Sequence, residues 1–264
     1  DPKVKLSSAQ CPKTKRDKYF MSKIPYREGV GRVLYLMCCT RPDIAFAVNQ
    51  CARFMDNPGI EHWNAVLRIL RFLKRTMKDC LTFGRMIGDS DTLGLSAYSL
   101  LNASNCTVAK NKVLLGFSDA DHAGCSSTRN STTGYIFFFN GPISWCSKLQ
   151  QTPAQSPCEA EYMALAAAGN ESRWLSQLMN EISPTLCEDV IIFEDNLSTI
   201  ALANNGKISP RTKHIDIKYH ILQEYIEADQ LRLLPCRTRL MCADAFTKNL
   251  GPTLGSTHFR TLMG

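Results

Sequence analysis

The sequence has no long hydrophobic run and no cysteine or histidine pattern that would hold zinc. No stretch approaches the roughly 18 uninterrupted apolar residues that a membrane helix needs, which excludes a helical membrane protein. The 12 cysteines include no Cys-x-x-Cys pair, and the 5 histidines are not spaced beside cysteines as zinc ligands. We therefore expect reduced thiols in an intracellular, non-secreted protein that has no membrane partner.

The sequence also lacks an initiator Met, an apolar signal region and a transit-peptide pattern. It begins with Asp1-Pro2, and we expect it to be a fragment of a longer protein. The composition, with 44% hydrophobic and 21% charged residues, is typical of a globular chain that buries a core. A length of 264 residues allows one large or two modest domains.

The net charge of +7 is unevenly distributed along the chain. Residues 1–86 contain 17 Lys and Arg against 7 Asp and Glu, whereas residues 87–264 contain 14 against 17. A basic part followed by a mildly acidic part suggests that the first binds a polyanion and the second gathers carboxylates. Charge alone leaves open the simpler alternative that the basic helices are only well solvated.

The first part of the chain predicts helices after a polar leader. Residues 1–24 are Lys-rich with little periodicity, so we expect an extended segment there. From Pro25 onward, apolar residues recur at helical spacing. In the last of these helices Arg68, Arg71 and Arg75 share one face, which is either a phosphate-binding surface or a solvated face.

Composition and periodicity both change after this helical part. Residues 87–109 are rich in Ser, Asn, Gly and Asp and predict a linker, so the expected division is 1–86, 87–109 and 110–264. In the last domain Asn140-Gly141 lies between two apolar runs and predicts a hairpin. The remaining runs predict a mixed sheet with helices on its faces. The expected strands are 113–117, 134–139, 143–146, 190–193 and 231–235, and the expected helices are 157–182, 197–204, 215–228 and 241–248.

Acidic residues recur where the expected strands end or the helices begin. The candidates are Asp119, Glu161, Asp195 and Asp244. Carboxylates at the ends of strands point toward the crevice where α/β sheets place their chemistry. Bringing several together without counter-charge is costly, so the pattern indicates a divalent cation. Oxygen ligands without His or Cys favour Mg²⁺ or Mn²⁺ over zinc.

Neighbouring acidic residues are distinguished by their local roles. Glu159 completes a capping box that Ser156 opens, which leaves Glu161 as the ligand candidate. Asp119 is preferred over Asp121 because it follows the apolar run directly.

The two later positions differ in how firmly the sequence assigns them. Asp195 precedes Asn196, a good N-cap, and is free to face the crevice, whereas strand alternation turns Glu194 to the opposite side. By spacing alone, Asp244 is as consistent with a favourable charge near a helix N-terminus as with a ligand.

At these residues the chain resembles the Pol polyproteins of copia-type LTR retrotransposons, from the end of the reverse transcriptase through the ribonuclease H domain. The resemblance covers nearly the whole chain, with the motifs in the expected order. The motifs are Tyr26 to Gly31, Thr40 to Ala45 and Phe54 to Trp63, then Gly116 to Gly124, Ser131 to Tyr135, Pro142 to Trp145, Glu159 to Leu165, Asp195-Asn196, Arg211 to Asp216 and Ala243 to Lys248.

The resemblance implies a ribonuclease H-like α/β fold. This is a five-stranded mixed sheet with its first three strands antiparallel and helices on both faces, preceded by a small helical thumb or connection segment. It implies that Asp119, Glu161, Asp195 and Asp244 are catalytic and bind two Mg²⁺ ions, with Mn²⁺ as the alternative. The implied location is the cytoplasm, virus-like particles or the nucleus. The paired aspartates of the polymerase palm are absent, so DNA synthesis is not expected of this fragment.

The expected reaction is hydrolysis of the RNA strand of RNA–DNA hybrids during reverse transcription, with the upstream reverse transcriptase as partner. The ribonuclease reads the wide minor groove and the 2′-hydroxyls by shape. Thr132, Asn196 and Lys213 are candidate contacts to the nucleic-acid backbone, although each of these residues is more often a turn, cap or surface residue. Arg68, Arg71 and Arg75 would hold the hybrid upstream of the cut. The number of subunits stays open.

Two positions depart from the family pattern. The loop Cys236 to Leu240 has no His, which some relatives carry before the last catalytic Asp, and Cys158 stands where many relatives have Thr. The alternative functions are a catalytically silent nucleic-acid-binding relic and a structural connection module of a retroelement polymerase. An integrase or resolvase core is disfavoured because Glu161 lies on the first long helix of the domain.

Overall fold

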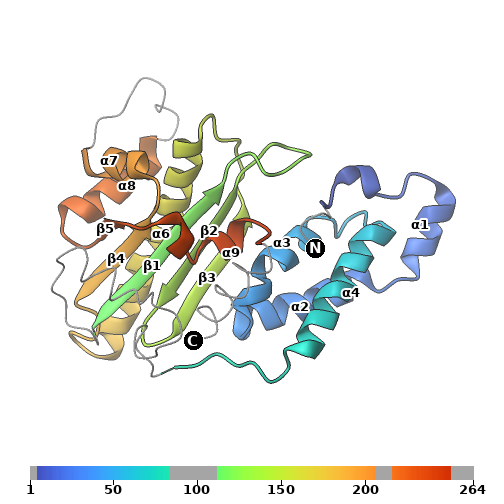
Figure 1. Cartoon of the computed structure of the whole chain (residues 1–264), viewed down its shortest axis with the longest axis horizontal. Helices are drawn as coiled ribbons and strands as arrows, with labels where there is room; N and C mark the ends of the chain where they lie inside the picture. Colours follow the sequence, from blue (N-terminus) through green and yellow to red (C-terminus); the bar gives the residue numbers. More distant parts are fainter. Residues whose placement is uncertain (1–4, 84–111, 206–215, 251–264) are drawn as a thin grey trace.

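A computed structural model describes residues 5–83, 112–205 and 216–250 of the chain. The expected linker at 87–109 and Lys213 lie outside these residues, so the domain boundary stays a prediction. The described residues form a twisted sheet with helices packed on it and a group of helices that extends from one edge of the sheet (Figure 1). Within this described part, no helix is both long and apolar enough to cross a membrane.

The sheet has five strands in the order β3-β2-β1-β4-β5. β2 is antiparallel to β1 and to β3, whereas β4 is parallel to β1 and to β5. This arrangement confirms the mixed sheet with three leading antiparallel strands and the ribonuclease H-like fold. The strands are β1 (Val113–Asp121), β2 (Thr132–Phe138), β3 (Pro142–Leu149), β4 (Asp189–Glu194) and β5 (Arg232–Pro235).

The β2–β3 connection is the hairpin that the sequence predicts. Asn140 and Gly141 have φ angles of 54° and 144°, a region that Asn and Gly enter more easily than other residues. The Phe139 amide donates to the Gly141 carbonyl at 2.8 Å and closes the turn. Local turn chemistry therefore decides where the two strands meet.

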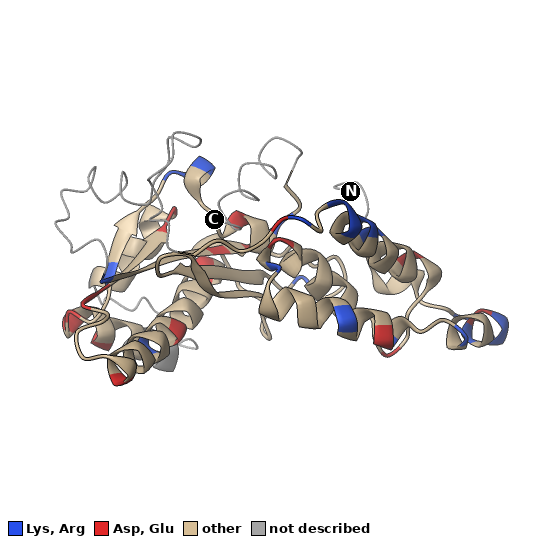
Figure 2. Ribbon diagram, turned by 90° about the horizontal axis from the view of Figure 1, so that it is seen from below, with Lys and Arg blue, Asp and Glu red and all other residues tan. Residues whose placement is uncertain are grey.

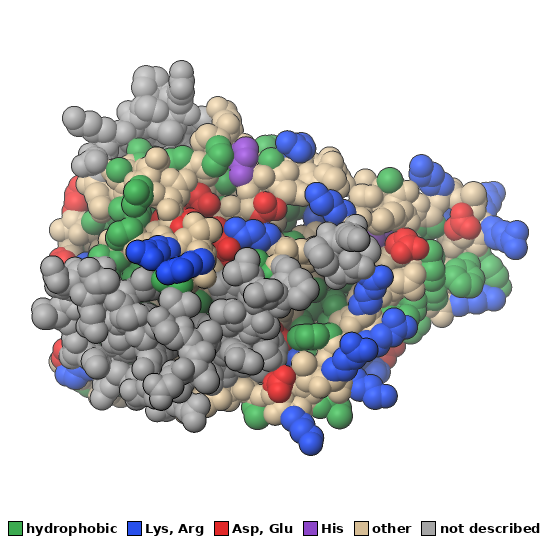
Figure 3. Space-filling model, in the orientation of Figure 1, with side chains coloured by type: hydrophobic (Ala, Val, Ile, Leu, Met, Phe, Trp, Pro, Cys, Tyr) green, Lys and Arg blue, Asp and Glu red, His purple; other side chains and the backbone are tan. Residues whose placement is uncertain are grey.

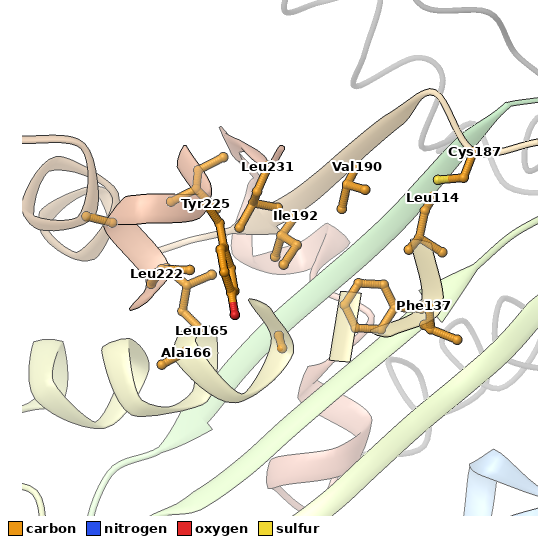
Figure 4. Packing of buried hydrophobic residues seen from close by; sticks show 14 of the residues in the cluster. Leu114, Phe137, Leu165, Ala166, Cys187, Val190, Ile192, Leu222, Tyr225 and Leu231 are labelled. Carbon is orange, nitrogen blue, oxygen red and sulfur yellow. The ribbon is translucent and has the colours of Figure 1, made fainter. Parts of the chain in front are cut away.

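One face of the sheet is covered by three helices that surround the larger core of the domain. Leu114, Phe137 and Ile192 point from the strands into this layer, and Leu165 and Tyr225 meet them from the helices (Figure 4). The long helix runs along β1 and β2, as its apolar face at helical spacing predicts. These helices are α6 (Pro157–Ile182), α7 (Leu197–Asn205) and α8 (Asp216–Glu227).

The opposite face has a second core, built on Phe117, Ile136 and Phe193. It is covered by short elements near the end of the chain, through Met241 and Phe246, both fully buried. The last helix is shorter than the 241–248 predicted, because the backbone at Met241 is extended (φ −71°, ψ 93°). These elements are the 3-10 helix η4 (Thr238–Leu240) and the helix α9 (Asp244–Thr247).

The N-terminal helices enclose a third core of their own, centred on Val30, Val48 and Val66, all three fully buried. The expectation of an extended segment over residues 1–24 is wrong. Thr14 caps a helix by accepting from the amide of Asp17 at 3.1 Å, a local signal that periodicity does not detect. The helices are α1 (Lys15–Ser22), α2 (Tyr26–Cys39), α3 (Ala45–Ala52) and α4 (Ile60–Arg75), with the 3-10 turns η1 (Ser8–Gln10) and η2 (Pro42–Ile44).

This helical part packs directly against the sheet. The indole nitrogen of Trp145 in β3 donates to the carbonyl of Met37 at 2.8 Å, and Asn49 donates to Ser147 at 3.4 Å. Ala45, the first residue of α3, belongs to the core on the second face of the sheet. The helical part therefore covers part of that face and reaches the same end of β3 as α9.

Gly134 is the position where α9 lies closest to the sheet. A Cβ atom at Gly134 would lie 2.6 Å from Thr247 Cγ2 and 2.8 Å from Phe246 Cβ, and 3.1 Å from the carbonyl oxygen of Ala243. Gly134 pairs across the ladder with Asp119. A side chain at Gly134 would therefore push α9 away from the strand that carries Asp119.

We predict that Gly134→Ala lowers the free energy of unfolding by about 1–3 kcal/mol, as overpacking of a well-packed core does. Urea unfolding measures the change. The matched control is Gly31→Ala in α2, where a Cβ would meet nothing within 4 Å, and it should keep or slightly raise stability because Ala favours a helix. Equal effects of the two substitutions would contradict the close packing of α9.

Candidate metal centre

Asp119 lies near the end of β1, on the same face of the sheet as Phe117. It is 2% exposed. The hydroxyl of Thr247 in α9 donates to its Oδ2 atom, which fixes the carboxylate against the sheet. Strand alternation and the closely packed α9 together set the direction of this side chain.

Glu161 comes from the first turns of α6, which the sequence starts at a well-defined residue. Ser156 caps the helix by accepting from the Glu159 amide at 3.2 Å, and Glu159 accepts from the Gln155 amide at 2.8 Å. Glu159 thus has the structural role predicted for it, with Gln155 as its partner instead of the cap residue. Small residues on β1 and α6, Ala120 and Ala160, let the helix approach the strand and bring Glu161 to its end.

Asp195 follows directly after β4, whose neighbour β1 runs parallel to it. The next residue, Asn196, is the predicted N-cap, because its side-chain oxygen accepts from the amides of Ser198 at 3.0 Å and Thr199 at 3.3 Å. Asp195 is therefore held between a buried strand and a capped helix, with its carboxylate half-buried.

The structure brings three of the four predicted ligands together. Carboxylate oxygens of Asp119, Glu161 and Asp195 all lie within 4.8 Å of one another. The Oε2 atom of Glu161 is buried without a hydrogen-bond partner in the described part of the chain. A buried carboxylate oxygen without a donor is unfavourable, and a bound cation would satisfy it.

Asp244 lies at the start of α9, beside Asp119, and a lysine joins the two. The Lys248 ammonium is 2.7 Å from Asp244 Oδ1 and 3.8 Å from Asp119 Oδ2. Lys248 follows Asp244 by four residues, so one short helix end presents both groups to the cluster. In Figure 3, acidic and basic side chains lie next to one another near the middle of the face.

Burial and mutual repulsion raise the pKa values of these carboxyl groups. Burial raises the pKa of Asp119 to about 6, with Lys248 opposing the rise and the charge of Asp244 adding to it. The pKa of Glu161 rises to about 10, first because of burial and then because of Glu194 and Asp119. Burial also raises the pKa of Asp244, against the hydrogen bond from Lys248.

The lysine is the positive group that the carboxylates attract. Burial alone would lower the pKa of Lys248, but Asp119 and Asp244 raise it above its usual value. A cation already lies between two of the predicted ligands, and the donor set consists of oxygens alone. The residues therefore fit a hard divalent cation such as Mg²⁺.

Sequence reasoning missed two residues of the site. Lys248 could have been found from its spacing to Asp244, one helical turn apart. Glu194 does face the α6 side of the sheet, as alternation predicts, but Glu161 approaches from that side too. Glu194 is fully buried, and its Oε1 accepts from the amide of Asn196 at 3.2 Å. It is the neighbouring charge that most raises the pKa of Glu161.

The residues predicted to contact nucleic acid are dispersed. Arg68 lines a cavity beside the cluster together with Thr132, which is buried at the start of β2. Arg71 and Arg75 are exposed on α4 but do not line this cavity. Asn196 serves as a helix cap, which is its structural alternative. Figure 2 shows Lys and Arg gathered at one end of α4 and on α1.

The chain is similar to polyproteins of plant transposons. It is 40% identical over 246 residues to "Retrovirus-related Pol polyprotein from transposon TNT 1-94" of Nicotiana tabacum, and 34% identical over 253 residues to the corresponding polyprotein from transposon RE1 of Arabidopsis thaliana. These matches cover 93% and 94% of this chain but 17% and 16% of the polyproteins. The chain thus spans only a small part of their length.

A third relative is much shorter. The chain is 40% identical over 157 residues to "Secreted RxLR effector protein 161" of Plasmopara viticola, a match that covers 59% of this chain and 94% of that protein. No protein-family model matches the chain.

The chain also matches two solved structures, both at low sequence identity. The structure of LC11-RNase H1, isolated from compost, matches 52% of this chain and 93% of its own, at a TM-score of 0.39 and 13% identity. The foamy viral protease-reverse transcriptase in complex with an RNA/DNA hybrid matches 90% of this chain and 28% of its own, at a TM-score of 0.43 and 12% identity.

The raised pKa values predict that the metal-free protein loses stability as the pH rises. Folding moves the pKa of Asp119 from 3.8 to about 6 and that of Glu161 from 4.5 to about 10. The folded state therefore keeps protons that the unfolded state has released. The free energy of unfolding falls as the pH rises from 3.8 to about 6, because of Asp119, and from 4.5 to about 10, because of Glu161. The change at Asp119 alone is on the order of 3 kcal/mol. Urea unfolding in EDTA at several pH values between 4 and 8 measures it.

Added Mg²⁺ should restore more stability at pH 8 than at pH 5, because protons and the cation compete for the same oxygens. The control is Asp119→Asn, which does not titrate and should show a flatter pH profile in EDTA. A wild-type stability that rises between pH 4 and 8 in EDTA, with no response to Mg²⁺, would contradict the carboxylate cluster.

Proposed function

Because the chain belongs to the Pol polyprotein family of copia-type retrotransposons, we propose that it hydrolyses the RNA strand of RNA–DNA hybrids during reverse transcription. The observation that carries this proposal is the meeting of Asp119, Glu161 and Asp195 within 4.8 Å, from positions far apart in the sequence. A cluster of buried carboxylates with little counter-charge is unfavourable unless it binds a cation.

The residues that would hold two Mg²⁺ ions are Asp119, Glu161, Asp195 and Asp244, with Mn²⁺ as the alternative metal. When bound, the metal supplies an activated water and stabilises the negative charge that develops on the phosphate and on the leaving 3′ oxygen. The fit rests on the all-oxygen donor set and on the unpartnered Oε2 of Glu161.

The neighbouring residues orient these ligands. Thr247 holds Asp119 through its hydroxyl, and Lys248 holds Asp244 at 2.7 Å. Lys248 is also near Asp119, so its ammonium offsets part of the repulsion within the cluster. The end of β4 fixes the direction of Asp195 and the capped α6 fixes that of Glu161, which keeps the ligands in place before substrate binds.

The proposed substrate is a hybrid whose backbone is bound by basic side chains. Of the three predicted arginines on α4, Arg68 lies closest to the cluster, because it lines the cavity that Lys248 also lines. Arg71 and Arg75 would contact phosphates farther along the duplex. In this proposal the upstream reverse transcriptase of the same polyprotein delivers the hybrid, inside the cell in which the element is expressed.

Two alternatives remain within the same fold. A silent nucleic-acid-binding relic would keep the basic surface without turnover, and a structural connection module would keep only the packing between helices and sheet. The ammonium of Lys248 between Asp244 and Asp119 is the observation that favours a silent site, because it partly replaces a metal charge. A cleavage assay separates the proposed enzyme from both silent alternatives.

We predict that the chain cuts a labelled RNA–DNA hybrid in Mg²⁺ and that Asp195→Asn abolishes cleavage. Loss of a ligand should exceed the roughly 10- to 100-fold effect of losing an outer partner. Gel analysis of the labelled RNA strand measures the rate. Asp189→Asn, at the other end of β4 and paired there with Arg232, is the matched control. Absence of cleavage by the intact chain would favour a relic or a structural module, and cleavage by Asp195→Asn would refute that assignment.

A second pair of variants tests which aspartate of β1 is the ligand. Asp119 belongs to the cluster, whereas Asp121 lines the adjacent cavity. Asp119→Asn should therefore abolish cleavage, and Asp121→Asn should keep it within about 100-fold of the intact chain, the upper end of the effect of losing an outer partner. Steady-state kinetics in Mg²⁺ measure both. If Asp121→Asn abolishes cleavage and Asp119→Asn keeps it, the ligand is Asp121 and not Asp119.

A further inference from the structure

A cavity of about 420 Å³ lies between the N-terminal helices and the end of the sheet. Arg53, which directly follows α3, and Arg68 in α4 line it on one side, and Asp121 and Lys248 line it from the sheet side. We call this space the interdomain cleft. Its volume falls in the range of ligand sites and is larger than a single phosphate group needs.

The interdomain cleft is strongly basic. Four cationic side chains line it, Lys5, Arg53, Arg68 and Lys248, against the single carboxylate of Asp121. A concave surface with one sign of charge concentrates the electrostatic potential and attracts a polyanion. Apolar side chains such as Phe46 and Ile69 also line the cleft, so it offers contact to a sugar or base as well as to a phosphate.

Arg53 is the cation best fixed in direction. Its Nη1 donates to Gln50 Oε1 at 2.9 Å and its Nη2 donates to Cys125 Sγ at 2.6 Å. Neither partner is a carboxylate, whereas Arg41 is neutralised by Asp43 at 2.7 Å. A guanidinium without a carboxylate partner keeps charge available for a phosphate and loses little freedom on binding one.

The interdomain cleft begins where the carboxylate cluster ends. Lys248 lines the cleft and contacts Asp244 and Asp119. Thr132, also in the lining, pairs across the ladder with Asp121, two residues beyond Asp119. A strand whose phosphate lies at the carboxylates therefore has its next backbone groups at the mouth of the cleft.

We propose that the interdomain cleft binds the sugar–phosphate backbone of the strand that enters the carboxylate cluster, with Arg53 as its fixed phosphate contact. Naming this ligand as nucleic acid rests on the proposed function. The helical part then has a defined role, since it supplies one wall of the cleft and two of its arginines. The contact that Arg53 makes lies next to the reacting phosphate, closer to it than the contacts of Arg71 and Arg75.

The test is equilibrium binding of a fluorescently labelled RNA–DNA hybrid to the full chain in EDTA, where cleavage does not occur. Arg53→Gln should weaken binding about tenfold, as removal of a hydrogen bond to a charged group does. The slope of log K against log salt should fall by about 1, because one phosphate fewer is neutralised by the protein. Arg27→Gln is the matched control, because Arg27 is exposed on α2 and does not line the cleft.

A second variant keeps the test valid if Arg53→Gln lowers stability by removing the hydrogen bond to Cys125. The double substitution Lys5→Gln with Arg68→Gln alters two other cations of the lining and should reduce the slope by about 2, one for each phosphate that these side chains neutralise. Circular dichroism and thermal unfolding check that each variant is folded.

Binding and slope equal to those of the intact chain in both variants would overturn the proposal, even where cleavage is normal. Absence of hybrid binding by the intact chain would overturn it too. Binding that weakens in the variants of a chain without cleavage activity would support the cleft and count against the proposed function alone. A 5′-mononucleotide that competes fully at micromolar concentration would contradict a site for a polynucleotide backbone.

Discussion

Repulsion among buried carboxylates is the constraint on which the rest of this structure depends. Asp119, Glu161 and Asp195 have oxygens within 4.8 Å of one another, in surroundings that raise the pKa of Glu161 to about 10. Such groups stay together only if the rest of the fold supplies the free energy or if a cation binds. The ammonium of Lys248 offsets part of the negative charge of the cluster, through one close contact to Asp244. We therefore expect the arrangement to be most stable with a cation bound, and such perturbed carboxyl groups are typical of functional sites.

The free energy comes from the two cores on either side of the sheet. Phe117 and Phe193 stack at 5.0 Å directly before the acidic ends of their strands, so the strand ends cannot move apart. Two helices must also pack closely on the sheet to complete the site. The missing side chain of Gly134 lets α9 approach, and the small side chain of Ala120 lets α6 approach. The acidic residues are therefore held by apolar and small neighbours that carry no chemistry themselves. Strain in the site is supported by packing outside it.

Much of this could be predicted from sequence, for identifiable reasons. Long apolar periods and strong turn chemistry placed α6 and the β2–β3 hairpin, since both signals are local. The short α1 was missed because its signal is a cap at Thr14 and not a period. Strand alternation alone excluded Glu194 from the ligand candidates. Its closeness to Glu161 depends on how α6 packs on the sheet, which a local pattern does not predict. Lys248 has a local signal in its spacing of four residues from Asp244, but its contact with Asp119 depends on the packing of α9 against the sheet.

The uneven charge along the sequence acquires a physical meaning in the folded chain. A basic segment and an acidic cluster that were far apart in sequence meet at the interdomain cleft, where Arg53 and Lys248 lie on opposite walls. An isolated acidic cluster would repel a phosphodiester, and a metal alone neutralises only the reacting phosphate. Cations on the adjacent wall offset the repulsion felt by the following phosphates. The hydrogen bond from Trp145 to Met37 joins the sheet to the helical part. It therefore also helps to position the cations of the helical part beside the cluster. In the proposed binding mode, the helical part and the sheet act as one surface toward a polyanion, which neither would present alone.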